Sequence, residues 1–560
     1  MRERAGERDR SARGGRGRPW HRRAPGAALA AAAVLLTAAG CGGGGGTGGS
    51  GGASPAASAA PTTVTTSSGT YQGVQRGGVR EFLGIRYAQA PTGAHRWTLP
   101  RAATAPQGVR HADKPGPRCA QSAAAPGAKP TLSEDCLFLN VTAPRDLRKG
   151  EKLPVMVWWH GGGYTSGAGS DYDAQRLADD GHVMVVTANY RLGVFGYLGL
   201  PGLEGSGDFG LADQVQSLRW TKANAARFGG DPDNVTVFGQ SAGAMSACAL
   251  LTSPSARGLV DKAVVMSGSC ALTWPAGTLF PGAPAQTPYT RLATGQADGA
   301  AAAKRLGCTG SGALDCLRRL PAATLVPLNQ EFSDHLAYGT PLLPKSPAEA
   351  VRAGDVAKVP VVSGGTRDEA RSFIGGAMKA APKAVTAKTY PALLRTAFGS
   401  HAAEVQRAYP LSRFGGSAGL AWSTVSTDAA WSCPTRSANA ELAKHTSVYA
   451  YEFADEHAPD VNGVGDPGFP LGAAHASDLP YLFDLGGKNL LHSSGQQQLS
   501  DKMIASWASF ARTGKPAAPD TPWSASLAAQ GKALALAPGG IAPVDTGSEH
   551  HCALWAGITG

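Results

Sequence analysis

The feature that most constrains this chain is a serine between two glycines, where a strand-like segment meets a helix-like one. The segment Val235–Phe238 favours a β-strand and leads into Gly239, Ser241 and Gly243, in the pattern Gly-x-Ser-x-Gly. An Ala-rich segment then continues without proline until Pro254. Such a strand–turn–helix arrangement holds a serine hydroxyl exposed at a sharp, strained turn. Because 75 glycines make a chance match easy, the flanking strand and helix carry the prediction that Ser241 is a nucleophile.

A second glycine-rich turn follows another apolar run. Val155–Trp159 has the pattern of a buried strand, and His160 then precedes three consecutive glycines, Gly161–Gly163. Three glycines let backbone N–H groups point at a developing oxyanion without obstruction by side chains. The same residues would also suit a tight glycine turn. Beside a nucleophilic serine, however, they predict an oxyanion hole.

Short apolar runs alternate with helix-like segments along most of the chain. Further runs of this kind span residues 183–187, 263–266, 359–362 and 448–453. Continuous apolar strands separated by helices indicate a parallel sheet that is covered on both faces. We predict one α/β domain over residues 69–560, with short antiparallel strands at its start and a helical insertion around residues 275–440.

Residues 1–40 have the pattern of an export signal. Nine arginines precede an apolar run of 13 residues, 27–39, and this run is shorter than the ~20 residues that a membrane-spanning helix needs. Cys41 directly follows Ala-Ala-Gly, which resembles a bacterial lipobox, so we expect Cys41 to carry a lipid that binds a membrane surface. Plain secretion and twin-arginine export through Arg22–Arg23 are the alternatives.

Residues 41–68 are rich in Gly, Ser, Ala, Pro and Thr and carry no charge, which predicts a flexible tether. The leader contributes +6 of the formal net charge of +11. The modest remaining excess of +5, without a basic patch interleaved with aromatic residues, gives no indication of nucleic-acid binding.

These motifs and others resemble the type-B carboxylesterases, the cholinesterase-like and para-nitrobenzyl esterase-like family of α/β-hydrolases. The resemblance implies an α/β-hydrolase fold and hydrolysis of carboxylic esters, and it covers nearly everything after residue 70. The matching segments, in family order, are FLGIRYAQAP (82–91), SEDCLFLNV (133–141), HGGGY (160–164), NYRLGVFGYL (189–198), GLADQ (210–214), FGGDPDNVTVFGQSAGA (228–244), GTRDEA (365–370), GAAHASDLPYLF (472–483) and FARTGKP (510–516).

The resemblance assigns a role to each member of a catalytic triad. Ser241 matches the nucleophile, Glu369 the acid and His475 the base, in the chain order of α/β-hydrolases. An imidazole must take the serine proton, and a carboxylate must fix the imidazole tautomer and stabilise the imidazolium. Asp368, the neighbour of Glu369, is the alternative acid.

The resemblance also implies an oxyanion hole and a set of disulfides. The backbone N–H groups of Gly162, Gly163 and Ala242 would bind the oxyanion, each contributing on the order of 3 kcal/mol. Disulfides are expected in an exported chain. The family's three loops imply the pairs Cys119–Cys136, Cys308–Cys316 and Cys433–Cys552. Cys248 and Cys270 are left over, either paired with each other or as buried thiols, because pairing cannot be deduced from sequence.

Two departures from the family bear on the substrate. Gln240 stands before the nucleophile where the family usually has Glu, so a negative charge is missing there. The loop 121–130, where cholinesterases carry a tryptophan that binds quaternary ammonium by cation–π attraction, has no aromatic residue. A neutral carboxylic ester therefore fits better than a choline ester, and the expected partner is a small-molecule ester substrate.

The sequence contains no metal-ligand spacing and no phosphate-binding loop, so we expect no metal and no cofactor. An amide, carbamate, thioester or polyester could be cleaved by the same triad. A non-catalytic binding protein built on this fold is a further alternative, which the complete set of triad and oxyanion residues disfavours. The sequence does not indicate the oligomeric state.

Overall fold

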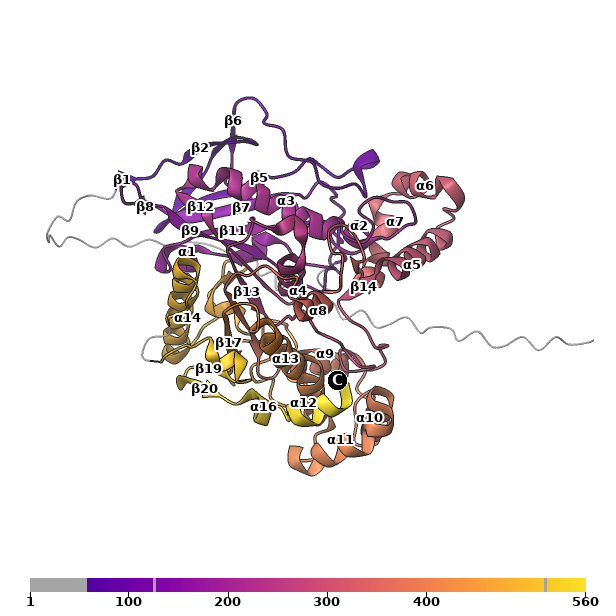
Figure 1. Cartoon of the computed structure of the whole chain (residues 1–560). Coiled ribbons are helices and arrows are strands. Elements are labelled where there is room, and N and C mark those ends of the chain that lie inside the picture. The colour runs from indigo at the N-terminus through magenta and orange to yellow at the C-terminus, as the bar shows by residue number, and fades with distance from the viewer. Residues whose placement is uncertain (1–57, 124–126, 518–520, 560) are drawn as a thin grey trace, which may run out of the picture.

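An 11-stranded sheet runs through the computed structural model, which describes residues 58–123, 127–517 and 521–559 (Figure 1). Its middle strands are parallel and its edge strands are antiparallel. This confirms the predicted mostly parallel α/β sheet. In spatial order the strands are β20 (Gly540–Val544), β19 (Ala533–Ala537), β17 (Val448–Phe453), β16 (Val361–Thr366), β13 (Lys262–Met266), β12 (Gly230–Gln240), β9 (Leu153–Trp159), β11 (Met184–Ala188), β7 (Phe138–Pro144), β5 (Val79–Arg86) and β4 (Val74–Arg76).

The central strand β9 is apolar at every position because both faces of the sheet are covered. Successive side chains of a strand point to opposite faces. In β9, Val155 and Val157 therefore join one core while Met156 and Trp158 join the other. All seven residues of β9 are buried. This explains why the run has no alternating polar positions.

Helices cover the two faces separately, as Figure 1 shows. The larger core lies under α3 (Phe209–Asn224), α4 (Ala242–Thr252), α8 (Pro347–Ala353) and α13 (Cys433–Leu442). The smaller core lies under α1 (Gln175–Asp180) and α14 (Ser494–Thr513). The short elements α2 (Gly193–Tyr197), α15 (Ser526–Ala529), α16 (Thr546–Glu549), β10 (Tyr172–Asp173) and β18 (Asp484–Leu485) lie in the connections.

The folded domain begins before residue 69, so the prediction that the tether extends to residue 68 is wrong at that end. β2 (Thr63–Thr66) pairs with β3 (Gly69–Gln72), and β3 pairs with β6 (Val109–His111). β2 alternates exposed threonines with buried residues, among them Val64, which is a strand pattern hidden in a Thr-rich segment. Even earlier, β1 (Ser58–Ala59) pairs with β8 (Asp146–Leu147). The signal segment and Cys41 lie outside the described residues.

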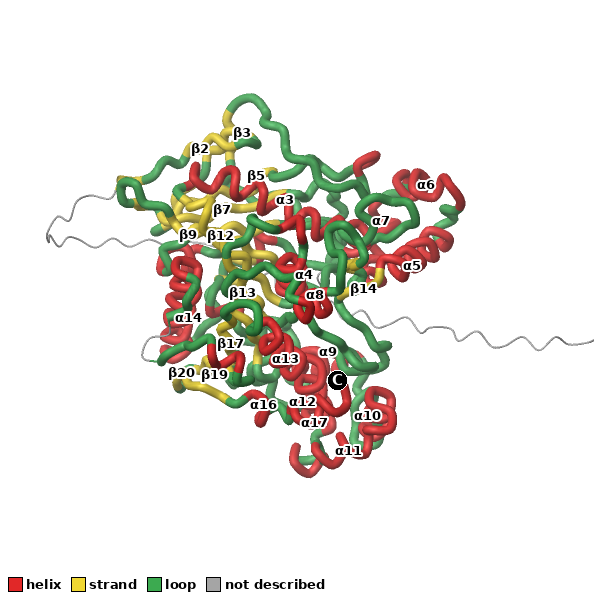
Figure 2. The backbone as a smooth tube through the Cα atoms, viewed as in Figure 1, coloured by secondary structure: helices red, strands yellow, loops and turns green. Residues whose placement is uncertain are grey.

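The predicted helical insertion at 275–440 is two helical groups, because β16 of the central sheet lies between them in the sequence. The helices of the two groups lie apart in Figure 2. The first group contains α5 (Leu292–Arg305), α6 (Ala313–Arg319) and α7 (Ala322–Leu325), together with the paired strands β14 (Tyr289–Arg291) and β15 (Leu336–Tyr338). The second contains α9 (Ala370–Ala380), α10 (Tyr390–Phe398), α11 (Ala402–Ala408), α12 (Ala418–Thr427) and a π-helical turn, Asp428–Ser432. With the terminal helix α17 (Cys552–Thr559), this second group forms a third core.

Four disulfides join the described cysteines. Three are the pairs implied by the family resemblance, Cys119–Cys136, Cys308–Cys316 and Cys433–Cys552. The fourth joins Cys248 and Cys270, which resolves the alternative that the sequence left open. Across the described part of the chain, no helix combines the length and apolar character that crossing a bilayer requires.

Candidate active site

Ser241 occupies a strained turn between β12 and α4. Its backbone has φ 56° and ψ −125°, a conformation that side chains other than glycine rarely adopt. The flanking glycines are required by close backbone contact. A Cβ at Gly239 would lie 2.5 Å from the carbonyl carbon of Gly243, and a Cβ at Gly243 would lie 1.9 Å from the carbonyl oxygen of Trp159. The Gly-x-Ser-x-Gly pattern therefore has a steric cause.

Strained residues gather at the carboxyl ends of the parallel strands, where α/β sheets place their ligand sites. Seven described residues other than glycine have positive φ, and four of them surround this edge: Tyr164, Ser241, Ser267 and Ala476. Ser241 N–H donates to the carbonyl of Met266, and Ser267 N–H donates to the carbonyl of Gly364. The turn after β12 is thus bonded to the end of β13, and the turn after β13 is bonded to β16.

Glu369 and His475 form a buried pair. Glu369 Oε2 lies 2.5 Å from His475 Nδ1, and the two residues are 2% and 5% exposed. The second carboxylate oxygen, Oε1, accepts a hydrogen bond of 2.9 Å from the N–H of Thr366. The His475 backbone N–H donates to the Glu369 carbonyl. The acid and the imidazole are therefore fixed in both side chain and backbone.

Asp368, the alternative acid, is engaged elsewhere. One of its oxygens lies 2.7 Å from Arg371 Nη2, and the other accepts a hydrogen bond from the Ala473 N–H at 3.0 Å. It therefore holds the loop that carries His475 without contacting the imidazole. The structure places Glu369, and not Asp368, at the histidine.

The glycine loop after β9 presents unengaged donors beside Ser241. Gly162 and Gly163 have φ values of 101° and 58°, and a Cβ on Gly161 would lie 3.0 Å from Ser241 Cβ. Within the described ranges, no protein acceptor takes the N–H of Gly162, Gly163 or Ala242. The first N–H groups of a helix such as α4 have no acceptor inside that helix. These three donors can therefore serve a bound oxyanion.

His160 supports that loop as a neutral ring. It is fully buried, and burial lowers its pKa from 6.5 to about 4. The ring stacks on Tyr190 with centroids 4.5 Å apart, and the Tyr190 hydroxyl donates to the His160 carbonyl at 2.7 Å. At neutral pH His160 adds no charge to the site.

Gln240 contacts the imidazole on its other side. Its Nε2 lies 3.1 Å from His475 Nε2, and the Gln240 side chain is buried. No hydrogen bond joins Ser241 Oγ to His475 in the part of the chain that the structure describes. Catalytic hydrogen bonds are often loose before substrate binds and tighten in the complex. The sequence flagged Gln240 only as a missing charge.

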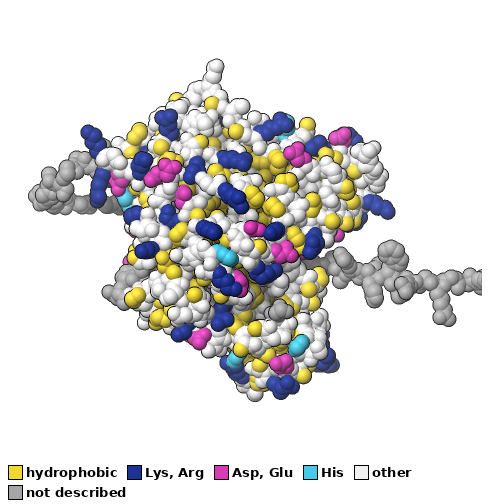
Figure 3. All heavy atoms as spheres, in the orientation of Figure 1, with side chains coloured by type: hydrophobic (Ala, Val, Ile, Leu, Met, Phe, Trp, Pro, Cys, Tyr) yellow, Lys and Arg dark blue, Asp and Glu magenta, His cyan; other side chains and the backbone are white. Residues whose placement is uncertain are grey.

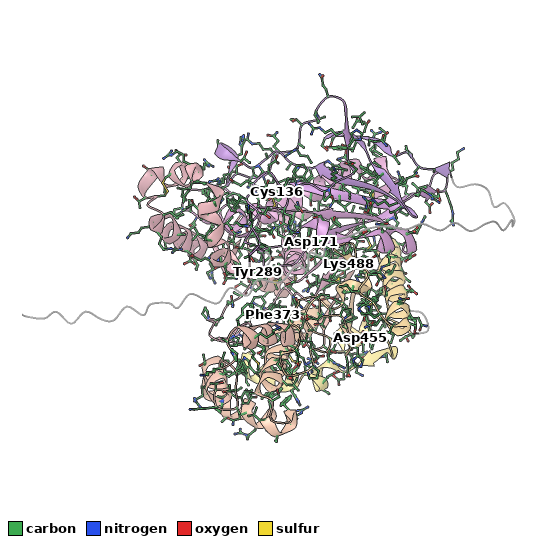
Figure 4. All side chains as sticks on the ribbon, turned by 180° about the vertical axis from the view of Figure 1, so that it is seen from behind. Cys136, Asp171, Tyr289, Phe373, Asp455 and Lys488 are labelled. Atoms are coloured by element: carbon green, nitrogen blue, oxygen red, sulfur yellow. A yellow bond between two sulfur atoms is a disulfide. The ribbon has the colours of Figure 1, made fainter. Side chains whose placement is uncertain are left out.

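Aromatic side chains from distant parts of the sequence pack against the imidazole of His475. The rings of Phe373 and Trp431 lie 4.8 Å and 4.9 Å from the His475 ring, centroid to centroid. They stack on each other at 5.7 Å, and Trp274 packs on Trp431 at 5.4 Å. Figure 4 labels Phe373 near the middle of the molecule. The sequence did not predict this wall, because α9, the π-helical turn and the loop after β13 come together only in the fold.

Asp478 is a further buried acid that the sequence did not single out. Burial, with the nearby Glu369 charge, raises its pKa to about 7. The Tyr451 hydroxyl lies 3.3 Å from Asp478 Oδ2. Asp478 is therefore part of the electrostatic environment of His475. The sequence did not indicate this, because nothing distinguishes an aspartate three residues after a histidine.

Across residues 58–123, 127–517 and 521–559, no group of three or more His, Cys, Asp or Glu side chains is arranged to hold a metal ion. Lys and Arg side chains on the visible face are interspersed with Asp and Glu (Figure 3). What the site offers is a serine, a buried carboxylate–imidazole pair and three backbone donors. That set suits acyl transfer.

Comparisons with known proteins agree with this geometry. The model of the carboxylesterase family matches residues 60–555. The para-nitrobenzyl esterase of Bacillus subtilis is 34% identical over 486 residues, covering 82% of this chain and 91% of that protein. The fumonisin B1 esterase of Sphingopyxis macrogoltabida is 32% identical, covering 80% and 81%. A solved thermophilic para-nitrobenzyl esterase superposes with a TM-score of 0.71 at 30% identity, covering 88% of this chain and 99% of that one.

Proposed function

The chain belongs to the carboxylesterase family and is a carboxylic ester hydrolase; we propose that it hydrolyses neutral esters through an acyl-enzyme with a Ser241–Glu369–His475 triad. The observation that carries the proposal is the buried contact of 2.5 Å between Glu369 Oε2 and His475 Nδ1. A carboxylate at Nδ1 fixes the proton there and leaves Nε2 as the base. Ser241 follows the residue that contacts Nε2.

In the proposed mechanism, Ser241 Oγ attacks the ester carbonyl carbon while its proton passes to His475 Nε2. Glu369 stabilises the imidazolium, and the N–H groups of Gly162, Gly163 and Ala242 bind the oxyanion. The tetrahedral intermediate collapses as His475 protonates the leaving alcohol. Water then loses a proton to His475 and attacks the acyl carbon, and His475 returns that proton to Ser241 Oγ as the carboxylic acid is released.

The surroundings of His475 support an uncharged, apolar group as the part of the substrate next to the imidazole. An aromatic surface is formed by Phe373, Trp431 and Trp274. Gln240 places a neutral amide where the family usually has a glutamate. An anionic group placed against such a surface would lose hydration without gaining a partner. Esters with a small or medium apolar acyl group fit this environment.

The test is hydrolysis of p-nitrophenyl esters, from acetate to long acyl chains, by wild type and Ser241→Ala. We expect hydrolysis of short or medium chains, with kcat falling by about 10⁴-fold or more in the variant. Ser437→Ala, at an exposed serine of α13, is the matched control and should keep wild-type activity. Activity unchanged in Ser241→Ala contradicts the proposal.

The same series separates the neighbouring chemistries. If the enzyme cleaves an amide, carbamate, thioester or polyester in preference to the ester, the assigned substrate class changes and the assigned triad does not. A folded wild type that hydrolyses no p-nitrophenyl ester and binds a protein instead would favour a non-catalytic role.

We also propose that the enzyme is exported and bound to a membrane surface through a lipid on Cys41. The leader pattern and four disulfides support it, because disulfides persist in oxidising compartments. Metabolic labelling with palmitate should modify the wild type, and Cys41→Ser should remove both the label and the membrane association. Wild-type protein that is secreted without label contradicts the anchor.

A further inference from the structure

The second ring nitrogen of His475 is already occupied, and its partner is Gln240 rather than the serine. Gln240 is the last residue of β12 and is 2% exposed. Its amide nitrogen lies 3.1 Å from His475 Nε2, which is within hydrogen-bond distance. The contact joins the nucleophile's own strand to the loop that carries the base.

The carboxylate on the other nitrogen determines the direction of this hydrogen bond. With Glu369 Oε2 at 2.5 Å from Nδ1, the proton of the neutral imidazole lies on Nδ1, and Nε2 has only a lone pair. A lone pair needs a donor, and the Gln240 amide NH₂ supplies one. Gln240 therefore donates to the atom that must accept the Ser241 proton.

The Gln240 side chain also approaches the glycine loop. A Cβ placed on Gly161 would lie 2.9 Å from Gln240 Oε1, so the amide is held between the glycine loop and the imidazole. A larger residue at position 161 would collide with it. The Gln240 amide thus lies between the oxyanion loop and the base.

We propose that Gln240 is a positioning residue that occupies the lone pair of His475 Nε2 in the resting enzyme and is replaced there by the Ser241 hydroxyl when substrate binds. The inference rests on the proposed function, since it assumes that His475 is the base for Ser241. A donor at Nε2 stabilises the neutral ring and opposes the imidazolium, whose Nε2–H would face it. A carboxylate at this position would instead accept a hydrogen bond from the imidazolium.

Other charged groups near the ring are the same in every variant that tests this. Glu369 faces Nδ1, and Asp478 lies close enough to interact with both Glu369 and His475. The surrounding Phe373 and Trp431 are uncharged. A change confined to position 240 therefore isolates the effect of that side chain.

The experiment measures pH dependence in wild type, Gln240→Glu, Gln240→Met and the control Gln498→Glu, which adds the same charge at an exposed position of α14. Two rates are followed: kcat/KM for p-nitrophenyl acetate, and inactivation by a fluorophosphonate, which reports the nucleophilicity of Ser241 without turnover. The acid limb of each profile reflects protonation of the free enzyme's base.

We expect the acid limb to move upward by about one pH unit or more in Gln240→Glu, because a carboxylate accepts from the imidazolium. In Gln240→Met, which removes the donor without adding a charge, it should move upward by roughly half a pH unit, the size of one ordinary hydrogen bond. Gln498→Glu should superimpose on wild type. A purely structural role would reduce rates without moving the limb.

Acid limbs that coincide in wild type, Gln240→Met and Gln240→Glu overturn the proposal. If Gln240→Glu does not fold, Gln240→Met alone decides it. The fluorophosphonate distinguishes failure of this inference from failure of the proposed function. If inactivation requires Ser241 but the acid limbs do not move, only the proposed role of Gln240 is contradicted. Absence of Ser241-dependent inactivation in the folded wild type overturns the proposed function and this inference with it.

Discussion

Two buried histidines in this molecule have carboxylate partners, and the difference between them separates the proposed base from a structural element. His475 has Glu369 at Nδ1 and the neutral amide of Gln240 at Nε2. His550 has Asp428 at Nδ1, at 2.7 Å, and Glu452 at Nε2, at 2.8 Å. They are 5% and 3% exposed. The two histidines are therefore buried to a similar extent, and they differ in the group that contacts Nε2.

His550 is held as a cation. Burial alone would lower its pKa, but the charges and hydrogen bonds of Asp428 and Glu452 outweigh burial and raise the pKa well above the ordinary value. An imidazole with a proton on both nitrogens has no lone pair to accept another. His550 therefore ties the C-terminal segment to the π-helical turn and to β17. At His475 only one nitrogen faces a carboxylate, so the other can act as a base.

The largest predicted effect on activity comes from removing the carboxylate that contacts His475. Glu369→Gln should lower kcat for p-nitrophenyl acetate by about 10⁴-fold, because the imidazole loses its fixed tautomer and the imidazolium its counter-charge. Asp368→Asn is the neighbouring control, and it should lose far less activity because Asp368 bonds Arg371 and Ala473. The reverse order of losses would identify Asp368 as the acid.

Two disulfides that close loops of different length, one of them beside His550, should differ in their effect on stability. Replacing Cys433 and Cys552 by alanine removes a link with a sequence separation of 119 and should cost about 4–5 kcal/mol of unfolding free energy. Replacing Cys248 and Cys270, separated by 22, should cost about 3 kcal/mol. Denaturant unfolding measures both, and an equal or reversed cost contradicts the loop-length argument.

Loss of a carboxylate at His550 should affect stability instead of catalysis. Glu452→Gln should lower the free energy of unfolding by about 3 kcal/mol, because it leaves a buried charge network incomplete. The kcat/KM of the folded variant should stay close to that of wild type, since Glu452 contacts neither His475 nor Ser241. A variant of wild-type stability with lost activity would give His550 a catalytic role.

The smallest effect is the pH dependence of stability. Because the pKa of His550 is raised on folding, its contribution is complete below the unfolded value of about 6.5 and is lost as pH rises through the folded value. Asp208 and Asp478 have pKa values raised to about 8 and about 7, so their effect on the pH dependence ends near pH 8.

Between about pH 8 and 9.5, below the titration of unfolded tyrosine, wild type should therefore lose on the order of 1 kcal/mol of unfolding free energy. In Glu452→Gln the decline should move to lower pH. Urea unfolding across this window measures it, and identical slopes in both proteins contradict the assignment to His550.

The sequence predicted the catalytic edge better than the rest of the molecule. Gly239, Gly243 and the glycines after His160 are sequence-local signals, because each reports a close backbone contact or a positive φ that other residues rarely adopt. His475 and Glu369 were found through the family resemblance, since nothing local distinguishes one histidine among 13.

The missed features depend on contacts between distant segments. The wall of Phe373 and Trp431 forms only because α9 and the π-helical turn pack together, and the His550 cluster joins three separate segments. The end of the tether was misplaced because Thr-rich composition hid the alternating burial of β2. Composition describes an average, whereas burial alternates residue by residue.

The most direct test of the comparison is a paired measurement of kcat/KM and thermal unfolding on His475→Gln and His550→Gln. We predict that His475→Gln loses about 10⁴-fold or more of its activity with little change in Tm. His550→Gln should lose several degrees or more of Tm, because it disrupts a buried charge network, with kcat/KM near wild type below that temperature. An active His475→Gln, or a stable but inactive His550→Gln, would contradict the account.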